Sequence, residues 1–291
     1  MNTRFATLAF HREVAATPAA LWFAWTSPGA RAEWSAPTPE VTIETLSAAL
    51  RPGGEEITLC RVEGQPDIRC DLRWLALQPE RRSVSTEIIS RDSVMLSAAL
   101  VTADLAPHGE GASLQLTVQL ASLAEDMEPG YQAGFAAALD NLVGLAHRTM
   151  VLQREIAAPP ALVWQAWADP KALPLWWGPE GFSCRTKRID LRAGGEWVFD
   201  MIGPDGTVFP NHHRISRHDR EARIDYTLHW GENGPKHADA SAIFEDLGGA
   251  TRVSLCMTFG DQAEYDQARG FGAYELGLQT LDKLARHLGV A

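Results

Sequence analysis

The sequence predicts an α+β fold in two tandem copies, in each of which a curved antiparallel sheet buries one face against a long C-terminal helix. The first observation is an internal repeat, because residues 10–34 and 152–176 share one pattern of Arg, Trp and Pro, so that Trp22 recurs as Trp164. The second is an alternation of apolar and polar residues, which indicates strands with one dry face. The third is a final segment with apolar residues three and four apart, which indicates an amphipathic helix.

The second copy shows the order of its first elements most clearly. A strand at 153–156 is followed by two short helices, at 161–168 and 171–176, and an Asp-Pro pair separates them. Proline is tolerated in the first turn of a helix but ends a helix that precedes it. The Gly- and Pro-rich stretch 177–181 is therefore predicted to be a loop.

The sheet and the last helix of the second copy follow in that order. Gly- and Asp-containing turns at 203–206 and 246–249 predict hairpins. An apolar stripe over 265–288 predicts one long helix, and Gly289 is suited to cap its C-terminus. Four segments alternate with a period of two, and they are 196–202, 223–230, 238–245 and 252–259.

The repeat has the size of a whole domain, and a chain of 291 residues can form two cores. We predict one domain over residues 1–148 and a second over residues 149–291. Almost no linker separates them, so we expect the copies to pack as a pseudo-symmetric intramolecular pair that imitates a homodimer.

Composition excludes several classes of function. The net charge of −11 disfavours binding to nucleic acid, which depends on neutralising phosphates with Lys and Arg. No apolar stretch has the length of a signal peptide or of a membrane span, so membrane insertion is not expected. The four cysteines lack the spacing of a zinc site or a disulfide framework, which favours the reducing cytoplasm. No cofactor is expected.

A series of motifs in the second copy is typical of one family. They are REIAAPPALVWQAWADP, LWWGPEGF, DLRAGGEWVFDMIGPDG, FPNHH and GLQTLDKLARHL, in that order. The series resembles the activator of heat-shock protein 90 ATPase-like family. That family belongs to the SRPBCC superfamily, with START lipid-transfer domains, the major birch-pollen allergen and polyketide cyclases. The resemblance covers residues 150–291 closely and 1–148 more weakly.

The resemblance implies a helix-grip fold with a cavity between the sheet and the long helix, where such domains hold a small hydrophobic or amphipathic molecule. We therefore expect a carrier or sensor of such a molecule, with its main pocket in the second copy. Trp164 and Trp167 are expected to pack the short helices onto the sheet. The predicted wall residues of the pocket are Trp176, Trp197, Phe199, Met201, Tyr226, Trp230, Phe244, Met257, Phe271, Tyr274 and Leu278.

The first copy departs from the second at the expected cavity wall. Counted from the paired glycines of each copy, Glu56 falls opposite Trp197. Either the strand slips by one residue and brings Ile57 and Leu59 inward, or the cavity wall in this copy is polar. We interpret the first copy as folded but functionally eroded or repurposed.

The histidines and carboxylates do not predict a metal site or a catalytic set. His212 and His213 are neighbours in the sequence, and on a regular strand they would point to opposite faces, so they could not both bind one ion. A single histidine that reaches into the pocket as a polar handle is more plausible than a metal site. Tyr226 with one of them and Asp200 would resemble a cyclase-like acid–base set, but Asp200 falls on the wet face. An enzyme is therefore less favoured than a binding protein. The alternatives are a cyclase- or hydrolase-like enzyme that uses the same cavity, and a protein-binding, co-chaperone-like module.

Overall fold

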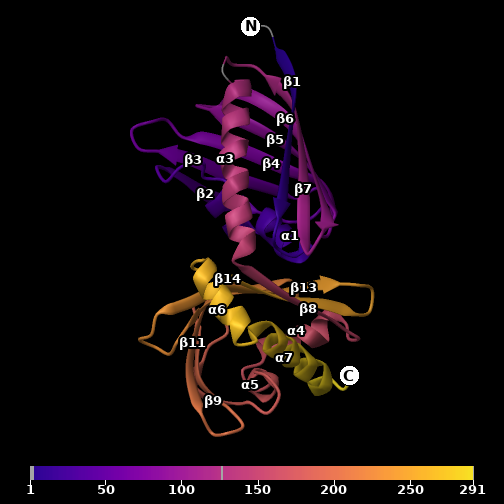
Figure 1. Cartoon of the computed structure of the whole chain (residues 1–291), viewed down its shortest axis with the longest axis vertical. Coiled ribbons are helices and arrows are strands. Elements are labelled where there is room, and N and C mark those ends of the chain that lie inside the picture. Colours follow the sequence, from indigo (N-terminus) through magenta and orange to yellow (C-terminus); the bar gives the residue numbers. More distant parts are fainter. Residues whose placement is uncertain (1–2, 126, 291) are drawn as a thin grey trace. The chain divides into compact units, whose positions relative to one another are not determined.

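The computed structural model describes residues 3–125 and 127–290. The chain divides into two compact units, Met1–His147 and Arg148–Ala291 (Figure 1). This division falls one residue before the boundary that the repeat predicts. Each unit has a hydrophobic core of its own.

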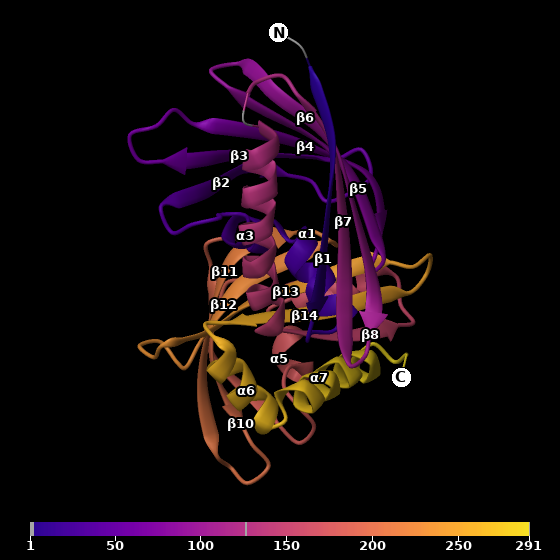
Figure 2. The ribbon, with the colours of Figure 1, turned by 45° about the horizontal axis from the view of Figure 1, so that its top comes forward.

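The first unit is a seven-stranded antiparallel sheet with the strand order β1-β7-β6-β5-β4-β3-β2. Helices α1 (Pro18–Thr26) and α2 (Pro28–Trp34) connect the first two strands, and helix α3 (Met127–His147) runs across one face of the sheet (Figure 2). The strands are β1 (Arg4–Val14), β2 (Val41–Ala48), β3 (Glu55–Val62), β4 (Ile68–Gln78), β5 (Arg82–Arg91), β6 (Val94–His108) and β7 (Gly111–Ser122).

The second unit repeats this topology in the order β8-β14-β13-β12-β11-β10-β9. Its helices are α4 (Pro160–Ala168), α5 (Leu173–Trp176), α6 (Gln262–Gly270) and α7 (Ala273–His287). Its strands are β8 (Thr149–Ile156), β9 (Ser183–Ile189), β10 (Glu196–Ile202), β11 (Val208–Asp219), β12 (Arg223–His229), β13 (Lys236–Asp246) and β14 (Thr251–Phe259). The two sheets thus have the same order of strands.

An ion pair between the first strand and the last helix recurs in both units. Arg12 Nε donates to Asp140 Oδ1 at 2.9 Å, and Arg154 Nε donates to Asp282 Oδ1 at 2.8 Å. Each aspartate belongs to the Leu-Asp-x-Leu motif that ends the repeat. The repeated residues therefore make the same contact between strand and helix in each copy.

A repeated tryptophan fastens the short helices together. Trp34 Nε1 donates to the carbonyl of Ala24 at 2.8 Å, and Trp176 Nε1 donates to the carbonyl of Ala166 at 3.0 Å. A buried indole needs such a partner for its N–H group. Trp176 is therefore bound into the packing of the α4–α5 segment.

The paired glycines form a tight turn before β3 and β10. Gly194 has a φ of 81°, a left-handed conformation that favours glycine. A Cβ atom on Gly195 would lie 2.3 Å from the carbonyl oxygen of Asp190, so no side chain fits there. Gly53 and Gly54 repeat both features.

The last helix differs between the copies. In the first copy α3 is one helix, whereas in the second the predicted helix over 265–288 is broken into α6 and α7. Gly272 sits at the break with a φ of 84° and directly precedes α7. The prediction of a single helix was wrong here, because the apolar stripe continues across a residue whose backbone is left-handed.

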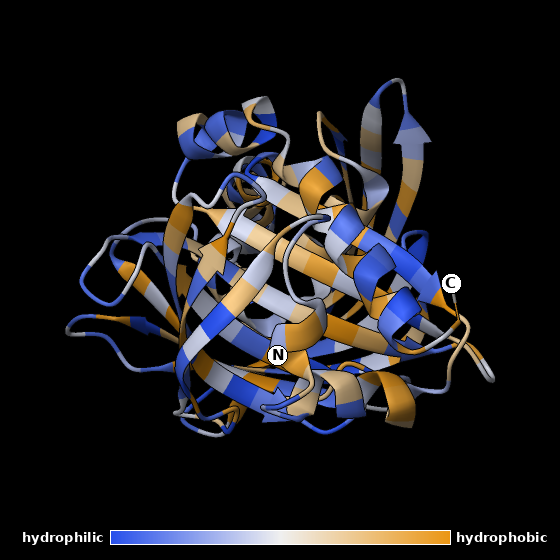
Figure 3. Ribbon diagram, turned by 90° about the horizontal axis from the view of Figure 1, so that it is seen from below, coloured by the Kyte–Doolittle hydropathy of each residue, from blue (hydrophilic) through white to orange (hydrophobic). Residues whose placement is uncertain are grey.

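The alternating segments lie in strands, and hydropathy alternates along many of them (Figure 3). The sequence pattern missed two strands of the second sheet, β9 and β11. Strand β9 is a charged edge strand, and β11 carries Pro, Asn and His near its start. Neither shows the alternation of apolar residues from which the other strands were predicted.

Candidate ligand-binding site

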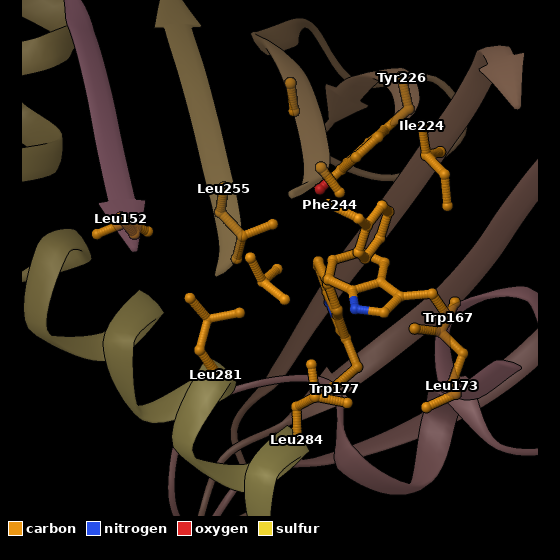
Figure 4. Close-up of a cluster of buried hydrophobic side chains, with 14 of the residues drawn as sticks. Leu152, Trp167, Leu173, Trp177, Ile224, Tyr226, Phe244, Leu255, Leu281 and Leu284 are labelled. Atoms are coloured by element: carbon orange, nitrogen blue, oxygen red, sulfur yellow. The ribbon is translucent and has the colours of Figure 1, made fainter. Parts of the chain in front are cut away.

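Aromatic side chains fill the interior of the second copy, where the sequence places the main pocket. Trp197 and Phe199 are buried and stack with ring centroids 3.9 Å apart. Trp167 packs edge-on against Trp177 and Phe244, and the three side chains are part of the buried cluster in Figure 4. A cavity among these side chains, lined by described residues, has a volume of about 30 Å³. That is room for a water molecule or two and not for an organic ligand.

The predicted wall residues of the second copy are exposed, buried or partly buried, and two of the buried ones line the small cavity. Trp230 and Phe271 are 46% and 53% exposed and do not belong to the interior cluster. Trp197 and Tyr226 line the small cavity. The buried members of the cluster are Trp176, Trp197, Phe199, Tyr226 and Phe244, and the partly buried ones are Met201, Met257, Tyr274 and Leu278. A ligand contact for any of them stays a prediction.

Of the residues considered for acid–base chemistry, His213 and Tyr226 come together, whereas His212 and Asp200 have other partners. His213 faces inward and stacks on Tyr226 at 4.9 Å, whereas His212 binds Glu196 with Nε2 and Oε2 2.6 Å apart. Asp200 accepts hydrogen bonds from Arg185 and Lys187, which lie on the neighbouring strand β9. Among the residues that the structure describes, no group of three or more His, Cys, Asp or Glu is arranged to hold a metal ion.

The buried His213 makes the second copy sensitive to acid. Burial, with a smaller contribution from His212, lowers the pKa of His213 to about 3, whereas an unfolded histidine has a pKa near 6.5. The unfolded chain therefore binds the extra proton, and stability is lost as the pH falls from about 6.5 towards 3, by at most about 1.4 kcal/mol per pH unit. When the pH is lowered from 7 to 5.5, we expect the free energy of unfolding to decrease by about 1 kcal/mol more in the unchanged chain than in His213→Phe, as measured by urea unfolding. Equal losses would show that His213 is not the group responsible.

A cavity of about 400 Å³ lies in the first copy, and it is much larger than the one among the aromatic side chains of the second copy. The sequence predicts the main pocket in the second copy, whereas this larger volume lies in the first copy. Its walls come from α1, α2, the segment after α2, strands β2 to β6 and helix α3. Most of the lining is apolar, including Trp25, Trp34, Leu72, Ile89 and Phe135.

Smaller and more polar side chains on two strands leave this space open. The strand registers place Glu56 and Ser85 where the second copy has Trp197 and Tyr226. Both smaller residues are buried and both line the cavity. The absence of two large rings from β3 and β5, the strands on either side of β4, accounts for the hollow interior, because side chains rather than the backbone fill such a space.

The wall of strand β3 is polar and the strand does not slip. Glu56, Thr58 and Cys60 line the cavity, whereas Ile57 and Leu59 do not. Since neighbouring residues on a strand point to opposite faces, this is the register that the paired glycines predict. Of the two alternatives for the first copy, the structure has the polar wall.

An arginine–glutamate pair closes one side of the cavity. Arg31 Nε donates to Glu56 Oε1 at 2.8 Å, and the two side chains are 13% and 4% exposed. The guanidinium carbon lies 5.3–5.8 Å from the ring centroids of three tryptophans, Trp25, Trp34 and Trp74. Such cation–π contacts and the carboxylate together engage the charge of Arg31.

A second carboxyl group, that of Glu87, lies apart from this pair. Tyr131 Oη donates to Glu87 Oε1 at 2.8 Å and lies 3.2 Å from the hydroxyl of Ser97. Burial raises the pKa of Glu87, and the hydrogen bond from Tyr131 opposes this rise. The adjacent Cys70 has a pKa well above its ordinary value, mainly because it is buried. Cys70 is therefore a thiol and not a reactive thiolate.

Helix α3 leaves room for the cavity because two of its lining residues have no side chain. Gly130 and Gly134 lie one turn apart, and a Cβ atom on either would meet no atom within 4 Å. Tyr131 and Phe135 line the same space. The sequence carried a signal for this site, namely two glycines four residues apart ahead of the Leu-Asp-x-Leu motif, and two glutamates in the segments that form strands β3 and β5.

The two sheets have the same strand order, and the C-terminal helices of each copy cover its sheet. This arrangement defines a pair of helix-grip domains in tandem. The chain belongs to the family of activator of Hsp90 ATPase homolog 1-like proteins, whose model matches residues 15–147 and again residues 157–289. Both the resemblance and the duplication expected from the sequence are thereby confirmed.

Several solved structures of bacterial proteins are similar to the chain. One is a crystal structure of a protein from Nitrosomonas europaea, 27% identical, which covers 50% of this chain and 96% of its own, with a TM-score of 0.45. A protein from Mycobacterium smegmatis is 25% identical and covers 50% and 93%, with a TM-score of 0.46. A solution structure from Arthrobacter aurescens is 21% identical and covers 50% and 89%, with a TM-score of 0.47. No curated protein matches the chain significantly. In the described part of the chain, no helix is both long and apolar enough to span a membrane.

Proposed function

We propose that the chain binds a small hydrophobic or amphipathic molecule in the cavity of its first copy. The cavity of about 400 Å³ carries this proposal. Ligand sites are commonly concave, mostly apolar and supplied with a few polar groups that fix orientation. The first copy has this combination, with Glu56, Glu87 and Tyr131 among its polar groups.

Native mass spectrometry on the full chain, purified without detergent, tests this proposal. We expect a reproducible adduct that is lost on denaturation and whose mass returns in an organic extract. A clean mass for the unliganded chain, together with no binding of added apolar probes, would overturn the proposal.

A second candidate function, as a protein-binding module related to a co-chaperone, is favoured for the second copy by its filled interior. That copy also exposes several large apolar side chains, which are Leu162, Leu175, Val208, Phe209, Trp230, Leu247 and Phe271. Exposed apolar surface of this kind is typical of protein contacts when it is contiguous. Binding of a partner that survives a blocked first-copy cavity would support this function.

The remaining predictions concern location and assembly. All four cysteines are free thiols, which supports our proposal of a reducing, cytoplasmic location. Packing of the two copies as an intramolecular pair stays a prediction.

A further inference from the structure

The cavity of the first copy has an uneven balance of charge. Among the described residues that line it, Arg31 is the cation, and Glu56 and Glu87 are the carboxylates. Arg31 is already paired with Glu56 at 2.8 Å. Glu87 has no cationic group within ion-pair distance in the described part of the chain; its hydrogen-bond donors are a phenol and a thiol.

Glu87 is nevertheless accessible from the cavity. Its side chain is partly exposed and lines the hollow, although it lies deep in the domain. Tyr131 holds one of its oxygens and is itself held by the buried Ser97. Arg31 attracts Glu87 only from beyond ion-pair distance, and burial still raises the pKa of Glu87. A cation bound directly against this carboxylate would offset the cost of burying its charge.

We infer that the cavity of the first copy selects ligands with a cationic amine on an apolar body, and that the amine binds Glu87. This inference rests on the proposed function and adds to it the chemical class of the ligand. The apolar lining, from Trp25, Leu72, Ile89 and Phe135, would cover the body of such a ligand. An anionic ligand is disfavoured, because the only lining cation among the described residues is engaged by Glu56.

A matched set of probes tests the inference on the full chain. Octylamine, octanol and octanoate share one alkyl chain and differ in their head group, so calorimetric Kd values at pH 7 report the head-group preference. We expect octylamine to bind about tenfold more tightly than octanol, as a charge-assisted hydrogen bond would give, and octanoate to bind most weakly.

The acidic chain as a whole also attracts amines, so the test needs a control for net charge. Glu87→Gln and Glu110→Gln change the net charge equally, but Glu110 is exposed between β6 and β7. We expect Glu87→Gln to abolish the preference for the amine and to leave octanol binding within about twofold, whereas Glu110→Gln retains the preference.

The outcomes separate the inference from the function on which it rests. Equal binding of octylamine and octanol, or an amine preference that survives Glu87→Gln, overturns the inference and leaves the proposed function standing. Failure of all three probes, together with no extracted ligand, overturns both. Equal affinities of the unchanged chain for octylamine and octanol would overturn the inference even where Glu87→Gln fails to fold, because that comparison needs no variant.

Discussion

Leucine in place of Gly134 is expected to block ligand binding by the first copy and at the same time to stabilise it. Gly134 lines the cavity from α3, and a side chain at this position enters open space. The Leu-Asp-x-Leu motifs align it with Leu276 of the second copy. A leucine at this position would occupy part of the cavity. It would also stabilise the helix, because a glycine in a helix interior lowers stability by about 1 kcal/mol relative to good helix formers. We expect binding at least about tenfold weaker and an unfolding free energy higher by about 1 kcal/mol.

Gly144→Leu is the matched control for Gly134→Leu. Gly144 lies on the same helix, is exposed and does not line the cavity. The Gly144→Leu variant should gain a similar free energy of unfolding and should bind an apolar ligand as tightly as the unchanged chain. Titration with an apolar probe and urea unfolding of both variants measure the two effects. If Gly134→Leu binds as tightly as the unchanged chain, the ligand does not occupy this cavity.

Among the single substitutions considered, removal of the Glu56 carboxylate is expected to lower the free energy of unfolding most. Glu56→Ala leaves the guanidinium of Arg31 without its charged partner in a site where it is only 13% exposed. Breaking a buried ion pair from one side commonly costs about 3–5 kcal/mol, because a buried charge is left uncompensated. We expect a loss near the lower end, about 3 kcal/mol in chemical unfolding, since the cavity admits some water.

A double variant and an exposed pair provide the controls for Glu56→Ala. Arg31→Leu with Glu56→Trp gives the residues that the second copy has at the matching positions, Leu173 and Trp197, and should recover most of the stability. Asp104→Ala breaks the exposed pair with Arg82 and should cost less than about 1 kcal/mol. A loss for Glu56→Ala as small as that for Asp104→Ala would contradict a buried, interacting pair.

The frame of the fold could be predicted from the sequence, because the residues that define it repeat. The Arg and Asp of the first strand and last helix, the Trp after α1 and the paired glycines occur in both copies and make matching contacts in both. Alternation predicted the strands whose apolar residues share one face. It could not predict β9, which is polar because it forms the edge of the sheet.

The location of the cavity could not be predicted in the same way. The volume of a cavity is the difference between the volume that the backbone encloses and the volume of the side chains that fill it. Trp197 and Tyr226 are aromatic, which favoured a ligand wall, but packed together they fill the second copy. Glu56 in place of an aromatic residue looked like a sign of erosion, yet it lines the copy that stays open. The strand register decides which residues meet, and the sequence left two registers open for β3.

The ion pair between the first strand and the last helix is the same in both copies, whereas the side chains that line the interior differ. Arg12 with Asp140 and Arg154 with Asp282 fix where the helix crosses the sheet, and neither pair lines either cavity. Because the frame does not depend on the interior, substitutions on the inner faces of β3 and β5 change the contents of a domain without moving its backbone plan. A duplicated scaffold of this kind lets one copy diverge in specificity while the shared architecture is inherited unchanged.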